Sequence, residues 1–511
     1  MIVEALIAFT FAAALVTFVA PNRVAGKLAF GLSLVPVLGS LFMWTQYDAS
    51  GNALLGGSLA FEETFEWLTL AGYELSWHTG VDGISMPLIV LTTVLTSLAI
   101  VSAWTPIDSR QSQFYGLFLF MEANLIGVFT ALDFFMWFVF WEAVLIPMYL
   151  LVGVWGGPRR KYAAIKFFVY TNIASLVMFI GFFALVFGLG DSISSLGLPE
   201  IAQALRDGQL SGFGGLDAST LRLVAFVAMF VGFGVKVPIV PLHTWLPDAH
   251  VEAPTPASVM LAGVLLKMGT YALLRFNFTM LPETATALAL PIAVIAVLSV
   301  IYGAMLALAQ QDLKRIVAYS SVSSMGYVIL GLIAYTVYGV GGATFQMIAH
   351  GLISGLMFMA VGVIYNTTHT RMVGDMSGMA DRMPITTGIF IAGAFGYMGL
   401  PLMAGFAGEF FIFVGSFGST VLPNNGLALF TAAAMFGIVI VAGYLLLAMQ
   451  RTLFGSFRLD TDYEVGPAPR HDTLALATLL VLVIALGVAP DMFFTMITDA
   501  VSPILETGGG L

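Results

Sequence analysis

Four ionisable side chains fall inside long apolar stretches of the sequence. Two are the lysines Lys236 and Lys267, and two are the acids Glu142 and Glu409. A charged side chain at the centre of a membrane span costs roughly 2.5–3.5 kcal/mol on insertion scales, so it needs a partner, water or a function. Groups of this kind at such depth can bind and release protons. The pattern therefore predicts proton transfer through a membrane.

Glu142 and Lys236 have opposite charge and similar depth, so we expect an ion pair between their two spans. Burial disfavours the ammonium form of a lysine and a nearby carboxylate favours it, so moving the carboxylate away releases the proton. A static pair that only fixes helix packing is the alternative. Pro238 adjoins Lys236 and interrupts the backbone there, which favours a pair that opens and closes.

The remaining candidates each have a structural alternative. Lys267 lies near the middle of its stretch with no neighbouring acid, at a depth of roughly 16 Å that disfavours snorkelling to the surface. Glu409 either ends a proton path or caps a half-helix. His350 is either a relay that titrates near neutrality or a satisfied core histidine. The role of the buried acid Glu122 stays open.

His243 belongs to a short segment that also contains Asp248, His250 and Glu252. Their spacing allows a metal site, but prolines on both sides indicate a loop that joins two helices. The sequence also lacks a phosphate-binding loop, a dinucleotide fingerprint and a zinc-protease motif. Chemistry on a small-molecule substrate is therefore not expected on this chain.

Composition identifies the solvent as lipid. The sequence is 59% hydrophobic and 9% charged, whereas soluble domains are about 25% charged. It contains no cysteine, which excludes thiolate-bound iron–sulfur clusters and disulfides from this chain. The net charge of -10 argues against nucleic acid as a partner.

A span needs about 20 apolar residues to cross roughly 30 Å of hydrocarbon. Fourteen stretches of that kind lie at residues 2–20, 28–46, 84–104, 113–132, 134–154, 166–188, 221–241, 257–280, 288–308, 314–336, 341–364, 386–416, 427–449 and 472–491. Backbone groups in lipid must bond within a helix, and the stretches lack the alternation of barrel strands. We therefore expect an all-α polytopic membrane protein with about 14 transmembrane helices.

Two of these stretches are interrupted. GVKVPIVPLHTWLP breaks the seventh, and GLPLMAGFAGEF breaks the twelfth, five spans later. Paired broken helices in corresponding positions are typical of inverted-repeat transporters, whose sites lie near the middle of the membrane. The sequence thus predicts two inverted repeats with Lys236 and Glu409 beside the breaks.

Basic residues indicate the orientation, because Lys and Arg stay in cytoplasmic loops. If the spans alternate, fourteen of the 19 basic residues fall on one side, and Arg206, Arg222 and Arg275 fall on the other. Both termini then point away from the cytoplasm, as does the loop at 47–83, which has no Lys or Arg. The first stretch lacks a cleavage site, so we expect it to remain as a helix.

Long motifs around these residues resemble a known family. GVKVPIVPLHTWLPDAHVEAPTPASVMLAGVLLKMGTYALLRF, WEAVLIPMYLLVGVWG and QQDLKRIVAYSSVSSMGY are similar to the antiporter-like membrane subunits of respiratory complex I. Most relatives of the L and N types place lysine in the second broken helix, so Glu409 resembles the M type. Many relatives also have histidine where this chain has Ser324, so the resemblance implies a path that depends more on water and His350.

The resemblance implies a single membrane domain over 1–511, with N-terminal helices at 1–112, inverted repeats at 113–280 and 288–449, and a last helix within 450–511. It also implies that Glu142 modulates Lys236, that Lys267 is the central relay and that Glu409 is the terminal group. His350 and His243 would line the route.

The implied function is proton translocation by a membrane-arm subunit of a bacterial NADH:quinone oxidoreductase in the inner membrane. This chain would bind no cofactor, because FMN, iron–sulfur clusters and quinone belong to partner subunits. Its expected partners are lipids and the other membrane-arm subunits, especially the paralogous L and N subunits. The alternatives are a subunit of a multisubunit sodium/proton antiporter, a membrane subunit of a proton-pumping hydrogenase, and a purely structural spacer.

Overall fold

The computed structural model describes residues 1–508, most of which are helical. Thirteen helices are long and apolar enough to cross a membrane. Two shorter apolar helices, α18 (Pro384–Tyr397) and α19 (Ala404–Phe417), occupy the twelfth predicted stretch and are separated by a break. The all-helical prediction with about fourteen spans is therefore confirmed.

The unbroken spans in chain order are α1 (Ile2–Val19), α2 (Asn22–Thr45), α3 (Ser85–Ser102), α4 (Gln111–Thr130), α7 (Arg160–Leu189), α14 (Ala289–Leu308), α15 (Leu313–Ile333), α16 (Val337–Thr368), α20 (Gly426–Thr452) and α21 (Arg470–Val488). The fifth span is kinked between α5 (Phe134–Ala143) and α6 (Leu145–Trp155). The seventh is α9 (Ala218–Lys236), followed by a break and α10 (Leu246–Glu252).

The eighth span changes helix type along its length. It consists of α11 (Thr255–Met260), the π-helix η2 (Leu261–Leu265), α12 (Leu266–Ala272) and a second π-helix, η3 (Leu273–Thr279). π-helical turns are rare and are frequently found at functional sites. Lys267 lies on α12, between the two π-helices.

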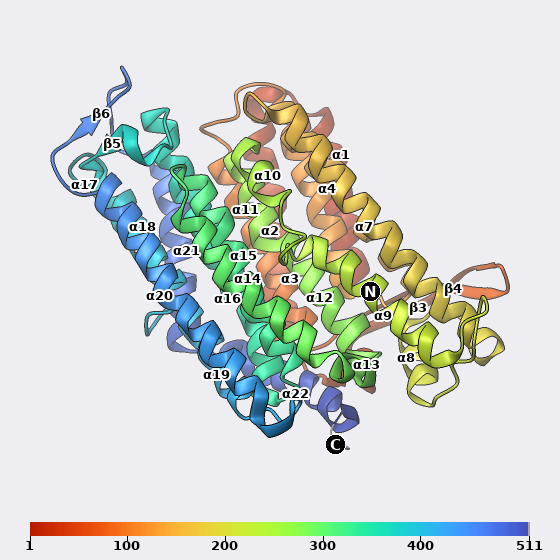
Figure 1. Cartoon of the computed structure of the whole chain (residues 1–511). Coiled ribbons are helices and arrows are strands. Elements are labelled where there is room, and N and C mark those ends of the chain that lie inside the picture. Colours follow the sequence, from red (N-terminus) through yellow and green to blue (C-terminus); the bar gives the residue numbers. More distant parts are fainter. Residues whose placement is uncertain (509–511) are drawn as a thin grey trace.

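Short elements join the spans. They are η1 (Gly190–Ser192), α8 (Leu198–Arg206), α13 (Pro282–Ala287), η4 (Val373–Asp375), α17 (Met379–Arg382), η5 (Pro423–Asn425) and the strands β1 (Ser50–Asn52), β2 (Gly56–Ser58), β5 (Met376–Ser377) and β6 (Arg458–Leu459). The predicted loop at 47–83 also forms a longer antiparallel hairpin, β3 (Ala60–Leu70) with β4 (Tyr73–Val81). Every one of these strands lies in a connection, so none crosses the bundle (Figure 1).

The C-terminal segment contains one helix that the span count did not predict. α22 (Asp491–Gly508) follows α21 and carries Asp491 and Asp499, so it is too polar to qualify as a span. It packs beside the 47–83 connection, because the Asn52 side-chain amide donates to the Ala500 carbonyl oxygen at 2.8 Å.

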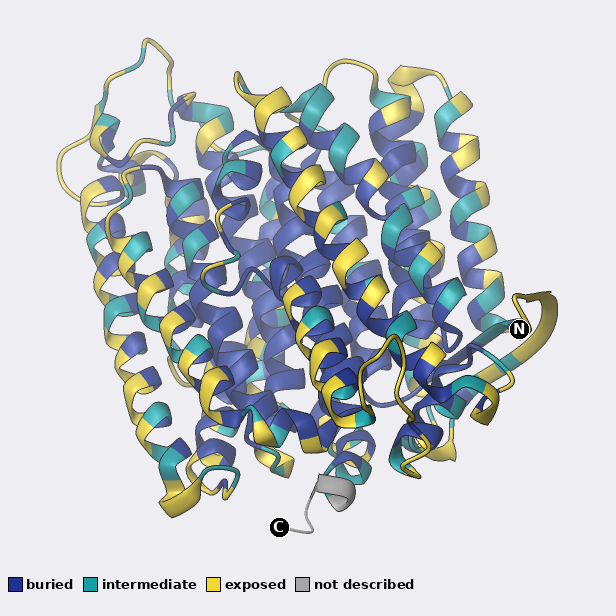
Figure 2. Ribbon diagram, turned by 45° about the vertical axis from the view of Figure 1, so that its right-hand side comes forward, coloured by how far each residue is buried: buried dark blue, intermediate teal, exposed yellow. Residues whose placement is uncertain are grey.

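The centre of the bundle is formed by the eighth span and α16. Every residue in the most apolar window of each of these two helices is buried. The outer helices instead show apolar side chains outward, as Leu38, Ile180 and Leu429 do. Figure 2 shows this contrast as a dark core inside helices with yellow outer faces. An apolar outer face is what contact with lipid requires.

Candidate functional site

Lys236 is the last residue of α9, at the first helix break. Its side chain is 3% exposed, and its Nζ lies 3.9 Å from the ring centroid of Trp141. A cation over an indole ring is attracted by the negative face of the ring. Nζ has no hydrogen-bond partner among residues 1–508, so the aromatic face is its nearest stabilising contact.

The predicted direct contact between Glu142 and Lys236 is absent. No ion pair of 4.0 Å or shorter joins them among the residues described. Glu142 lies at the kink between α5 and α6, and its Oε2 accepts a 3.4 Å hydrogen bond from the Asn172 side-chain amide instead. The expected direct contact is thus not made in this conformation, although the charge of Glu142 is near enough to act on Lys236.

Lys267 and His350 come together in the core although they are 83 residues apart in the chain. Lys267 Nζ lies 2.6 Å from His350 Nδ1 and donates to the Ala262 carbonyl oxygen at 2.5 Å. Both side chains are buried. His350 Nε2 has no hydrogen-bond partner among residues 1–508. The imidazole can therefore accept a proton on one nitrogen and release one from the other.

Two glycines allow this contact. A Cβ built on Gly351 of α16 would lie 2.8 Å from the Gly263 carbonyl oxygen and 2.7 Å from Leu91 Cδ2. One built on Gly263 of η2 would lie 2.6 Å from Leu95 Cδ1 and 3.4 Å from the Gly351 carbonyl oxygen. Only glycine lets two backbones approach this closely. The approach sets the distance between Lys267 and His350.

Hydroxyl groups continue from His350 toward the second break. The His350 and Tyr397 rings lie edge to face with centroids 5.8 Å apart. The Tyr397 and Ser321 hydroxyls are 3.4 Å apart, and Tyr444 donates to the hydroxyl of neighbouring Ser320 at 2.6 Å. Hydroxyls both donate and accept hydrogen bonds, so this row can support proton movement.

Glu409 lies in α19, after the second break. It is the sixth residue of that helix and makes no contact as an N-cap, since the N-cap residue is Met403. The capping alternative is therefore excluded. Its Oε2 has no hydrogen-bond partner within residues 1–508 and faces Gly399, whose φ is +63°. Glu409 is thus a buried carboxylate directed at the break.

His243 lies in the first break, apart from the contact between Lys267 and His350. Its ring faces Tyr302 and Tyr319, with centroids 5.9 and 6.3 Å away. Its Nδ1 has no hydrogen-bond partner within the described chain.

The metal alternative in this segment does not fit the contacts. Both Asp248 oxygens are engaged in ion pairs, one with Lys166 at 2.7 Å and the other with Arg315 at 2.8 Å. His250 stacks on Phe358 with centroids 4.3 Å apart. No group of three potential metal ligands occurs among residues 1–508.

His250 is a buried titratable residue that was predicted only as part of a loop. The flanking prolines suggested irregular structure, but residues 246–252 form α10 and bury the imidazole. Neither ring nitrogen has a hydrogen-bond partner among the residues described. The apolar side chains between the charged residues of LPDAHVE were the available sign that this segment is a partly buried helix.

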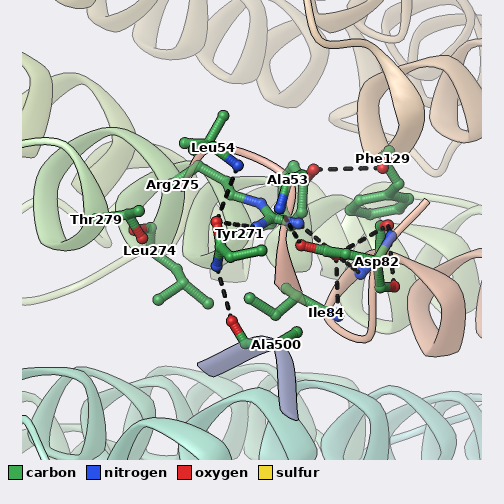
Figure 3. Close-up of polar contacts among 12 residues, drawn as sticks. Ala53, Leu54, Asp82, Ile84, Phe129, Tyr271, Leu274, Arg275, Thr279 and Ala500 are labelled. Carbon is green, nitrogen blue, oxygen red and sulfur yellow. Dashed lines mark hydrogen bonds and ion pairs between the residues drawn. The ribbon is translucent and has the colours of Figure 1, made fainter. Parts of the chain in front are cut away.

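A buried ion pair anchors the far end of the Lys267 helix (Figure 3). Arg275 Nη2 donates to Asp82 Oδ1 at 2.6 Å, and the two side chains are 2% and 0% exposed. The same carboxylate accepts from the backbone amides of Ala53, Ile84 and Ser85. Burial acts to raise the pKa of Asp82, but Arg275 and the amides hold it below its usual value. From the sequence Arg275 was predicted only to mark orientation, and its pairing with Asp82 was not predicted.

Comparison with known proteins places these features in a family. Residues 131–437 match the family described as NADH:quinone oxidoreductase/Mrp antiporter, transmembrane. A NAD(P)H-quinone oxidoreductase chain 4 of Trichormus variabilis is 38% identical, with 96% of this chain and 88% of the relative aligned. The NADH-quinone oxidoreductase subunit M of Rhodobacter capsulatus is 38% identical, with 95% and 91% aligned.

Solved structures agree in fold. A chain of respiratory complex I from Thermus thermophilus superposes with a TM-score of 0.86 at 25% identity and covers 100% of both chains. A chain of the Mrp complex from Dietzia sp. superposes with a TM-score of 0.83 at 18% identity, over 99% of this chain and 98% of that one; this likeness concerns the fold alone. The chain described here belongs to the NADH:quinone oxidoreductase/Mrp antiporter transmembrane family.

Proposed function

We propose that this chain is the M-type membrane subunit of a bacterial complex I and translocates protons while partner subunits oxidise NADH and reduce quinone. The observation that carries the proposal is the contact of Lys267 with His350, buried between two broken helices. Relatives of matching length are named as subunits of quinone oxidoreductases. Glu409 at the second break, where antiporter relatives usually carry lysine, favours this function over a sodium/proton antiporter.

Protons move along the buried side chains in this proposal. The Lys267 ammonium passes a proton to His350 Nδ1, and His350 releases one from Nε2 toward the hydroxyl groups of Tyr397 and Ser321. Glu409 accepts protons at the second break. His243 serves the route from the first break, where Tyr302 and Tyr319 surround it.

Glu142 and Lys236 supply the switch. The structure holds them apart, with Lys236 over Trp141 and Glu142 bonded to Asn172. Closing the pair favours the protonated lysine, and opening it leaves the ammonium with an aromatic face in place of a counter-charge. Opening therefore drives the proton of Lys236 onward, and closing reloads it.

The chain is proposed to lie in the bacterial inner membrane with both termini on the periplasmic side. Support comes from a cluster of basic residues at one end of the bundle, where Lys166 and Arg315 pair with Asp248 and Arg371 pairs with Asp312. Basic residues collect on the cytoplasmic side. Met1 instead contacts Glu63 of the external hairpin.

The division into repeats at 113–280 and 288–449 is part of the same proposal. We also propose that FMN, iron–sulfur clusters and quinone bind to partner subunits. The paralogous L and N subunits are the proposed neighbours in the membrane.

A Lys236→Ala substitution tests the proposal in the assembled complex. NADH-driven proton uptake into vesicles and quinone reduction are measured after native gels have shown intact assembly. We expect both rates to be lost, because the switch loses its proton carrier. Lys161→Ala is the matched control, since Lys161 is exposed at the start of α7. Normal uptake by the Lys236 variant would leave only a structural role for this site.

A further inference from the structure

Glu122 is a buried acid that the proposed path does not use. It lies on α4 and is 0% exposed. Neither carboxylate oxygen has a hydrogen-bond partner among residues 1–508. Keeping such a group at the centre of a span costs several kcal/mol, so a functional role is the default explanation for an ionisable residue in this position.

The register of α4 directs Glu122 toward the helix that bears Lys267. Phe129 of α4 contacts Tyr271 of α12, because the two rings lie edge to face at 5.3 Å and the Tyr271 hydroxyl donates to the Phe129 carbonyl oxygen. Glu122 precedes Phe129 by seven residues, which is about 20° short of two full turns. Glu122 therefore faces α12 along the same line of contact.

The two helices run in the same direction, which fixes the relative depth of their residues. Ser109, two residues before α4, accepts a hydrogen bond through its carbonyl oxygen from the Trp155 indole. Gly157, two residues after Trp155, donates to the carbonyl oxygen of Glu252 before α11. Both helices thus start at the same end of the bundle. Glu122 precedes Phe129 by seven residues and so lies about 10.5 Å closer to that end. Lys267 precedes Tyr271 by four residues and so lies about 6 Å closer to it.

The resulting offset along the helix axis is about 4.5 Å, and helices in contact have axes 8–10 Å apart. Lys267 precedes Tyr271 by four residues, so it is only about 40° around α12 from the face that meets α4. Glutamate and lysine side chains can span such a separation directly or through one water molecule.

We infer that Glu122, on α4, is a second proton-exchange partner of Lys267 besides His350. Resting on the proposed function, the step is a balanced transfer: the Lys267 ammonium and a Glu122 carboxylate give a neutral amine and a carboxylic acid, and the reverse reloads the lysine. His350 and Glu122 then compete for one proton, and the conformation of the Lys267 side chain selects between them.

Glu122→Gln and Glu122→Asp in the assembled complex test this inference. The glutamine variant keeps the size of the side chain and loses its proton-carrying group, so proton uptake should fall by about 10²-fold, the lower limit for a positioned proton-transfer group. The aspartate variant should recover part of that rate. Asn124→Ser is the matched control, because Asn124 is buried on the same helix but lies about 200° around it.

Infrared difference spectra between resting and turning-over complex give a readout that a packing role would not change. We expect a carbonyl band of a protonated carboxyl that disappears in Glu122→Gln and shifts in Glu122→Asp. If the glutamine variant does not assemble, the aspartate spectrum decides, and an unshifted band overturns the inference. Wild-type uptake by Glu122→Gln overturns it as well. Neither result touches the proposed function, which the Lys236 and Lys267 variants test separately.

Discussion

Gly351→Ala should uncouple the central contact by moving one helix away from another. The added Cβ would meet the Gly263 carbonyl oxygen at 2.8 Å, whereas ordinary contacts begin at 3.4 Å. The backbones must therefore separate by about 0.6 Å, and the carbonyl cannot rotate away as a flexible side chain would. That shift stretches the 2.6 Å contact of Lys267 with His350 toward the limit of a hydrogen bond.

Displacements near 1 Å in a reacting pair lower rates by as much as 10²-fold. We expect proton uptake driven by NADH to fall by about tenfold in the Gly351→Ala complex, within that range. Gly355→Ala is the matched control one turn further along α16, since its Cβ would meet only the end of the Leu95 side chain at 3.0 Å and Val259 at 3.6 Å. Uptake at the wild-type rate by an intact Gly351→Ala complex would refute the reasoning.

Three further substitutions address the anchor of the Lys267 helix and the second helix break. Arg275→Met leaves the Asp82 carboxylate buried without its cation, which should cost about 3–5 kcal/mol of stability; thermal unfolding of the complex measures it, and an unchanged transition contradicts the buried pair. Gly399→Ala places a Cβ 2.5 Å from Glu409 Oε2 at a backbone φ of +63°, so proton uptake into vesicles should fall. Gly388→Ala is the control, because nothing lies within 4 Å of its Cβ. Equal uptake rates in the two variants would contradict a role for the position of Glu409. Glu409→Gln should abolish uptake while native gels show assembly, and persistent uptake excludes Glu409 as a terminal carrier.

The spans and both helix breaks could be predicted because their signals are local. Runs of apolar residues identify helices in lipid, and Pro238 and Pro241 cannot continue α9. The β3–β4 hairpin was missed since a polar connection of that length carries no span signal. α22 was missed because its acids place it below the apolar threshold.

The side-chain contacts of the site could not be predicted from local sequence in the way that the spans and helix breaks could. Nothing in the spacing of Lys267 and His350 shows that glycines bring their helices together. Opposite charges suggested that Lys236 binds Glu142, but Trp141 is the immediate neighbour of Glu142 in the chain and offers its ring to the lysine. The side-chain conformation of Lys236 decides whether it contacts Trp141 or Glu142, and that conformation cannot be predicted from the residue types.

The most direct test of the central claim is proton uptake by a complex that carries Lys267→Met. Methionine preserves the apolar length of the side chain but cannot hold a proton, and native gels first establish that the complex assembles. If Lys267 is the central relay, vesicles will take up no protons when NADH is supplied. Uptake at the wild-type rate by the assembled variant would show that protons cross this membrane without Lys267.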